Sequence, residues 1–205
     1  MFLPAQRLIG IVTMLVVMAA TLFAADRGGA AAAHSGVSKA AIPLVIYKNG
    51  NDDSGYIPSG WMGDTGNIHY NGHCSTAHPP HGSDCIRIKY ASDSGWGGIV
   101  WQNPANNWGD APGGFDLTGA KTLSFWAKSK HAGQIVTFGY GVIGKAKKYR
   151  DTSKVMRKIT LTKKWKKYSF KLKGRDMTRI VTGFFFSAGA AGKPFTIYLD
   201  NIEYK

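Results

Sequence analysis

Phe195-Thr-Ile-Tyr-Leu-Asp-Asn-Ile-Glu-Tyr204 is the stretch that decides the fold class of this 205-residue chain. Phe195, Ile197 and Leu199 recur at every second position, and so do Ile202 and Tyr204, which is the period of a β-strand with one face turned to a core. Tyr168-Ser-Phe-Lys-Leu172 has the same alternation. The two stretches therefore predict strands rather than helices.

Other short apolar runs have the length and composition of strands, and no run beyond the first 25 residues keeps a helical apolar stripe for three turns. We expect strands at 42–47, 86–90, 98–101, 122–127, 135–140, 155–161, 165–172, 180–187 and 195–204. The chain has 26 glycines, mostly between these runs, as turns require. This pattern predicts an all-β fold, an antiparallel β-sandwich or jelly roll.

Three segments resemble strands of bacterial carbohydrate-binding modules. They are Gly119-Ala-Lys-Thr-Leu-Ser-Phe-Trp-Ala127, Ile159-Thr-Leu-Thr-Lys-Lys-Trp-Lys-Lys-Tyr-Ser-Phe170 and the closing Phe195–Tyr204. The resemblance covers about residues 42 to 205 and is nearest to modules of the family 11 type and related secreted proteins. It implies a galactose-binding-like β-sandwich that binds carbohydrate.

The resemblance also implies a place for calcium. In such modules the final Asp often helps to hold a structural calcium ion or hydrogen-bonds the first strand. Asp200 is the matching residue here, and Asp52 or Asp53 could assist. The usual closing Asp-Asp is Asp200-Asn201 in this chain, which weakens the inference, so no cofactor is expected to be required.

The first 40 residues predict a signal peptide followed by a linker. Residues 1–25 have the pattern of a signal peptide, with Arg7 near the start and an apolar run from Leu8 to Ala25 that ends in small residues. The apolar run also approaches membrane-spanning length, so an uncleaved anchor is the alternative. Residues 26–40 predict a disordered linker and residues 41–205 one domain. The expected location is secreted or periplasmic, with membrane contact only if the leader is uncleaved.

Cys74 and Cys85 are the only cysteines in the chain. An exported protein meets oxidising conditions, so these two residues predict a disulfide. In the chain-entropy model, closing a loop of this size contributes about 3 kcal/mol.

Positive charge is concentrated in the second half of the chain. The segment Lys121–Lys173 holds 16 of the 26 Lys and Arg residues against a single acid, Asp151. Such a field attracts polyanions. Export disfavours nucleic acid as the partner, so an anionic glycan is expected, although outward strand faces also carry lysine simply to stay soluble.

The most informative segment for function is Trp96-Gly-Gly-Ile-Val-Trp-Gln-Asn-Pro-Ala-Asn-Asn-Trp108. Aromatic rings stack on the C–H faces of sugars, and side-chain amides donate to and accept from hydroxyls. We therefore predict a binding site in which tryptophans stack and asparagines hydrogen-bond. Its expected members are Trp61, Trp96, Asn103, Asn106, Asn107 and Trp108.

Two metal hypotheses and one enzyme hypothesis are weaker. Four histidines near the cysteines could bind a transition metal, but their spacing fits no regular pattern; they are His69, His73, His78 and His81. Cleavage after Ala33 would leave an N-terminal His34, which with a second histidine could clamp copper. A glycosidase needs two flanking carboxylates, and nothing in the sequence pairs the few acids present.

The sequence thus predicts an exported, non-catalytic carbohydrate-binding protein with a basic surface that favours anionic glycans. The alternative is an envelope-associated structural or protein-interaction sandwich, and a polysaccharide-active enzyme is a third possibility. The sugar and the oligomeric state are not encoded in any of these patterns.

Overall fold

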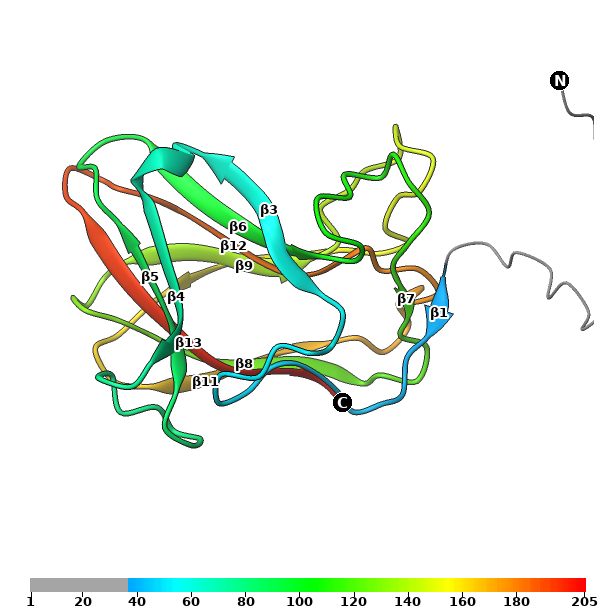
Figure 1. Cartoon of the computed structure of the whole chain (residues 1–205), viewed down its shortest axis with the longest axis horizontal. Coiled ribbons are helices and arrows are strands. Elements are labelled where there is room, and N and C mark those ends of the chain that lie inside the picture. Colours follow the sequence, from blue (N-terminus) through cyan, green and yellow to red (C-terminus); the bar gives the residue numbers. More distant parts are fainter. Residues whose placement is uncertain (1–36) are drawn as a thin grey trace, which may run out of the picture. The chain divides into compact units, whose positions relative to one another are not determined.

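Two antiparallel sheets face each other across an aromatic core in the computed structural model, which describes residues 37–205 (Figure 1). The five-stranded sheet runs β10-β9-β12-β6-β3, with β10 Val155–Thr160, β9 Ile135–Tyr140, β12 Thr182–Gly189, β6 Trp96–Gln102 and β3 Ile57–Gly63. The six-stranded sheet runs β11-β8-β13-β5-β4, with β2 also paired to β13. Its strands are β11 Lys166–Lys171, β8 Thr122–Ser129, β13 Phe195–Tyr204, β5 Cys85–Tyr90, β4 Ile68–Cys74 and β2 Leu44–Tyr47. The predicted all-β sandwich is confirmed.

Large side chains from alternate strand positions fill the space between the sheets. Trp101 contacts Phe184 with ring centroids 5.4 Å apart, and Phe125 lies 5.2 Å from Phe184 and 4.9 Å from Phe138. All four rings are fully buried. Aromatic pairs of this kind stabilise a core by about 1 kcal/mol each beyond their area burial. Trp101 is therefore a structural member of the tryptophan-rich segment.

The nine expected strands are all present; β9 and β13 have the expected ends, and the ends of the others are shifted by one or two residues. The sequence analysis missed β3 and β4, the short 3-10 turn Thr65–Asn67 between them, and the two-residue strands β1 Ser38–Lys39 and β7 Phe115–Asp116. β3 contains Pro58 and two glycines, and it lies at the edge of its sheet, where proline is tolerated.

Asp151 anchors the long loop between β9 and β10 to β12. Its buried carboxylate accepts hydrogen bonds from the backbone N–H groups of Ile143, Val181 and Thr182 at 2.6–3.0 Å, and from the Thr182 hydroxyl at 2.6 Å. Burial raises the pKa of Asp151, and these hydrogen bonds offset part of that rise. The only acid of the basic segment is thus a structural residue.

Cys74 and Cys85 lie directly opposite each other on β4 and β5. Both are buried free thiols here, and the Cys85 thiol donates to the Cys74 carbonyl at 3.0 Å. Opposed residues of an antiparallel pair have Cα atoms about 4.5–5.5 Å apart, within the range that a disulfide spans. The disulfide stays a prediction, and this register is compatible with it.

The leader at 1–25, its anchor alternative, and residues 26–36 of the expected linker lie outside the described residues. Within the rest of that linker range, Ser38 and Lys39 pair in parallel with Phe115 and Asp116. Ala40 is buried, and its N–H donates to the Asp116 carbonyl at 3.0 Å. Among residues 37–205, no helix is long and apolar enough to cross a membrane.

Candidate functional site

Strand register places small and polar side chains on the outer face of the five-stranded sheet. Ile99 and Trp101 of β6 point into the core, so Trp96 and Gly98 point outward. Ser187 of β12 pairs with Gly98, and Thr137 of β9 pairs with Ser187. The outward side chains at these positions, apart from Trp96, are small, so the surface there lies close to the backbone of the sheet.

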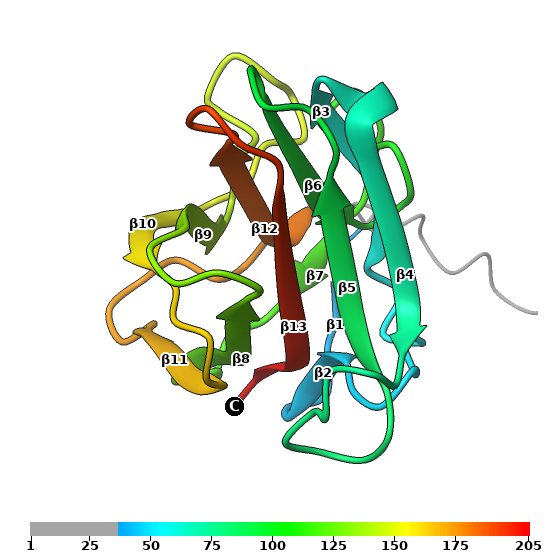
Figure 2. The ribbon, with the colours of Figure 1, turned by 90° about the vertical axis from the view of Figure 1, so that its left-hand side faces the viewer.

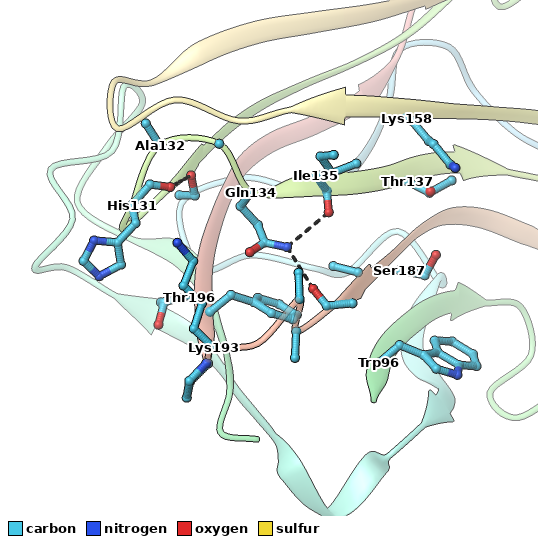
Figure 3. A pocket seen from close by; sticks show the side chains of 18 residues that line it. Trp96, His131, Ala132, Gln134, Ile135, Thr137, Lys158, Ser187, Lys193 and Thr196 are labelled. Atoms are coloured by element: carbon cyan, nitrogen blue, oxygen red, sulfur yellow. Dashed lines mark hydrogen bonds between the residues drawn. The ribbon is translucent and has the colours of Figure 1, made fainter. Parts of the chain in front are cut away.

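A cleft of about 550 Å³ opens at the Trp96 end of this face (Figure 3). Trp96 and Ile135 are the exposed large hydrophobic residues that line it, with 48% and 56% of their surfaces accessible. Ser187 and Thr137 line the cleft from the sheet. In the view of Figure 3, Trp96 lies at one end and His131 at the other, with Gln134 between them.

Gln134 is held with its amide in the cleft. Its Nε2 donates to the backbone carbonyls of Ile135 and Gly189, both at 3.1 Å. Its Oε1 accepts no hydrogen bond from residues 37–205 and is free to accept one from a ligand. The site therefore presents a positioned acceptor beside an exposed indole.

Gly189 leaves room next to the indole. It pairs with Trp96 in the sheet register and lines the cleft. A Cβ added at Gly189 would meet only the Gly95 carbonyl oxygen, at 3.7 Å, which is ordinary contact. The space above this glycine is therefore open to a ligand.

The cleft is cationic. Lys158, Lys193 and His131 line it, and no Asp or Glu does. Lys158 and Lys193 also have no carboxylate within ion-pair distance among the described residues. The cleft thus combines an aromatic plane, hydroxyl and amide groups, and positive charge.

The predicted tryptophans do not share one face. Trp61 is 38% exposed, but it pairs with the inward-facing Ile99 and so lies on the opposite side of the sheet from Trp96. Its Nε1 donates to the Pro58 carbonyl at 3.2 Å. Trp108 is half-buried in the loop after β6. Only Trp96 of the three lines the cleft.

Two of the predicted asparagines hold the loop after β6 together. Asn107 is buried; its Nδ2 donates to the Ala111 carbonyl, and its Oδ1 accepts from the backbone N–H of Gly109 at 3.0 Å. Asn103 donates to the Gly55 carbonyl at 2.9 Å and accepts from the N–H of Gly114.

Asn106 differs from these two asparagines because it is exposed. Its backbone N–H donates to the Ser59 hydroxyl at 2.8 Å, and its amide side chain has no protein partner among residues 37–205. Of the three predicted asparagines, its side chain is thus the one open to a ligand, although it lies outside the residues that line the cleft.

Asp200, the candidate calcium ligand, is fully buried under N–H donors. Its carboxylate accepts from the backbone N–H of His81 at 3.1 Å and of Asn201 at 2.7 Å. Burial raises the pKa of Asp200, which these donors partly counteract. Asp52 and Asp53 are exposed. Calcium needs six to eight oxygen ligands, so N–H donors around Asp200 suit an unmetallated carboxylate better.

The histidine cluster is spread out in space. The His73 ring lies 3.4 Å from Asp84, and the His81 ring packs edge-on to Trp126 at 5.7 Å. Across residues 37–205, no group of three or more His, Cys, Asp or Glu side chains is arranged to hold a metal ion. His34 lies outside the described residues.

Sequence reasoning did not single out four polar members of the cleft, namely Gln134, Thr137, Ser187 and Lys193. Thr137 and Ser187 occupy the outward positions of strands that were predicted, so their exposure follows from alternation alone. Their neighbourhood depends on the strand order, which no local pattern encodes.

Known structures share this fold, although sequence comparison finds no matching family model and no matching curated protein. A family 30 carbohydrate-binding module superposes with a TM-score of 0.56 at 17% identity, covering 80% of this chain and 99% of that one. The family 30 module of the Clostridium thermocellum cellulase Cel9D-Cel44B gives 0.53 at 15%, with coverage of 80% and 98%.

The family 11 module of Lic26A-Cel5E from Clostridium thermocellum gives a TM-score of 0.50 at 18% identity, covering 81% of this chain and 95% of that one. The resemblance to modules of the family 11 type is therefore confirmed as a likeness of fold. The chain is an antiparallel β-sandwich with the architecture of carbohydrate-binding modules.

Proposed function

We propose that this protein binds carbohydrate, without catalysing a reaction on it, in the cleft beside Trp96. The observation that carries the proposal is the exposed Trp96 indole next to the free Oε1 of Gln134 and the open surface at Gly189. A sugar ring offers an apolar C–H face and a rim of hydroxyls. The indole suits the first, and Gln134, Ser187 and Thr137 suit the second.

The structural neighbours support the choice of ligand. All three solved structures described above are carbohydrate-binding modules by name. These structures support the fold class, and the lining of the cleft suggests which residues of this chain would contact a sugar.

Charge favours an anionic glycan over a neutral one. Lys158 and Lys193 flank the cleft, and no lining residue is acidic. A carboxylate or sulfate on the sugar could form a charge-assisted hydrogen bond with one of these ammonium groups, and no acidic residue of the cleft would repel it.

A glycosidase mechanism lacks its residues at this position. Hydrolysis of a glycosidic bond requires two carboxyl groups on opposite sides of the bond. No carboxyl group lines the cleft. A binding role therefore fits the composition of the site better than turnover, and we place the protein outside the cytoplasm on the strength of its leader sequence.

The test fills the cleft without disturbing the core. Gly189→Leu places a side chain beside the indole, whereas Gly189→Ala adds one methyl group and serves as the matched control. We expect the wild type and Gly189→Ala to bind a polysaccharide from a panel of neutral and acidic polymers, and Gly189→Leu to lose that binding.

Thermal unfolding of both variants shows whether the fold is kept. Equal binding by the folded Gly189→Leu variant would refute the cleft as the site. Failure of the wild type to bind any polysaccharide would favour the alternative of a protein-interaction sandwich, and release of reducing ends would revive the enzyme hypothesis.

A further inference from the structure

The edge strands β10 and β11 end their sheets on the same side of the sandwich (Figure 2). A groove lies between these two strands. Its volume is about 870 Å³. Five cationic residues line it, two from β10 and three from β11 and the turn that follows: Arg157, Lys158, Lys171, Lys173 and Arg175. We propose that this groove is a second binding site, specific for the carboxylate or sulfate groups of an acidic polysaccharide.

Arg157 stands where a sandwich strand normally carries an apolar residue. Val155, Arg157 and Ile159 share one face of β10, and Arg157 pairs with the core residue Phe138. This face looks into the space between the sheets, yet Arg157 is exposed because the sandwich is open at this edge. A guanidinium at this position faces the groove and can form two parallel hydrogen bonds with a carboxylate or sulfate.

Arg175 is already positioned across the groove. Its Nη1 donates to the carbonyl of Lys154, the residue before β10, at 3.0 Å. Its Nε reaches the Lys171 carbonyl on β11 at 3.4 Å. The guanidinium therefore bridges the two walls and keeps a positive charge at one end of the groove at little further entropic cost.

No acid neutralises these charges within the described part of the chain. None of the ion pairs among residues 37–205 involves a cation of the groove. The acid next to Arg175 in sequence, Asp176, forms no ion pair with a cation of the groove, and its carboxylate accepts instead from the hydroxyl of Thr178 at 2.6 Å and from its N–H at 3.0 Å. An incoming anion therefore meets uncompensated charge on both walls.

The groove and the cleft meet at Lys158, which borders both, although its pairing with Thr137 puts its side chain on the outer face of β10. One extended glycan could lie with a sugar on Trp96 and its acidic groups along β10. The choice of a polysaccharide rests on the proposed function, whereas the anion chemistry of the groove does not. Nucleic acid fits less well, since Tyr168 and Phe170 are the only aromatic residues lining the groove and base stacking needs exposed rings.

The experiment compares two double variants that each remove one Arg and one Lys. Arg157→Gln with Lys171→Gln removes two of the five cations of the groove, and Arg87→Gln with Lys89→Gln removes the same charge from exposed positions of β5, away from the groove in the six-stranded sheet. The probes are polygalacturonate, dextran sulfate, uncharged dextran and a single-stranded oligonucleotide, measured by calorimetry at low and high salt.

We expect the groove variant to bind the acidic polymers at least about tenfold more weakly, which corresponds to the loss of one charge-assisted hydrogen bond. The β5 variant should bind them nearly as well as the wild type does. Equal weakening in both would show a diffuse field and overturn the site. Unchanged binding together with aggregation of the groove variant would mean that these charges only protect the edge strands. A larger effect on the oligonucleotide than on the acidic polymers would overturn the choice of partner.

Failure of the groove and failure of the proposed function are distinguishable. If Gly189→Leu abolishes all glycan binding while the groove variant changes nothing, the cleft stands and the groove is refuted. If Gly189→Leu has no effect and the groove variant loses acidic polymers, the groove stands and the cleft is refuted.

Discussion

Replacing Trp96 with alanine removes the aromatic plane of the cleft, and its effect on affinity follows from the exposed area. With 48% of its surface accessible, Trp96 offers about 120 Å² to a ligand. A sugar ring that covers half of this area removes about 60 Å² from water, worth about 1.5 kcal/mol. Stacking geometry adds about 1 kcal/mol. The total of about 2.5 kcal/mol corresponds to a roughly 60-fold weaker Kd.

The assay is calorimetric titration of the wild type and Trp96→Ala with whichever polysaccharide the wild type binds. Trp61→Ala is the matched control, because Trp61 is exposed to a similar extent but lies on the other side of the sheet. Unfolding curves must show that both variants fold. A loss below threefold for Trp96→Ala, or an equal loss for Trp61→Ala, would refute stacking at this cleft.

Three further predictions concern stability. Asp151→Asn should lower the free energy of unfolding by about 2 kcal/mol, because it turns an amide toward buried donors. Burial raises the pKa of Asp151, so the folded wild type binds the proton more tightly than the unfolded chain does. The difference in unfolding free energy between wild type and variant, measured in denaturant, should therefore grow as pH falls from 7 through that raised pKa toward 3.8. Oxidation should join Cys74 and Cys85, so that a thiol titration of the denatured protein finds neither thiol free, and it should raise the free energy of unfolding by about 3 kcal/mol. Thiols that stay free after oxidation would contradict the disulfide. Chelation should leave the melting temperature within about 2 °C, because N–H groups surround Asp200; a larger drop would establish a structural metal ion.

The strands that could be predicted are those with an unbroken apolar run or a clear alternation of apolar residues. β9 begins and ends where the pattern of Ile135–Tyr140 places it, and β13 follows the closing stretch. β3 and β4 escaped because Pro58, Gly60 and Gly72 interrupt their apolar rows. Both are edge strands, which pack on one neighbour only and so tolerate residues that a central strand excludes.

The candidate site could be predicted only in part. An exposed Trp96 could be expected because it stands just before the predicted strand 98–101, in a turn. The structural role of Asn107 could not be predicted. Its amide hydrogen-bonds to the backbone of its own loop, and the sequence does not distinguish an asparagine that stabilises a turn from one that binds a ligand. Gln134 meets Trp96 only through the order β9-β12-β6, which depends on long-range pairing.

The position of β13 has a consequence for how the molecule acquires its shape. β13 comes after every other strand of the sandwich in chain order, yet it pairs with β8 on one side and with β5 and β2 on the other. During synthesis on the ribosome, β2, β5 and β8 therefore wait without their shared central partner until the last segment emerges. Folding should therefore be late and slow, because the closing contacts span most of the domain.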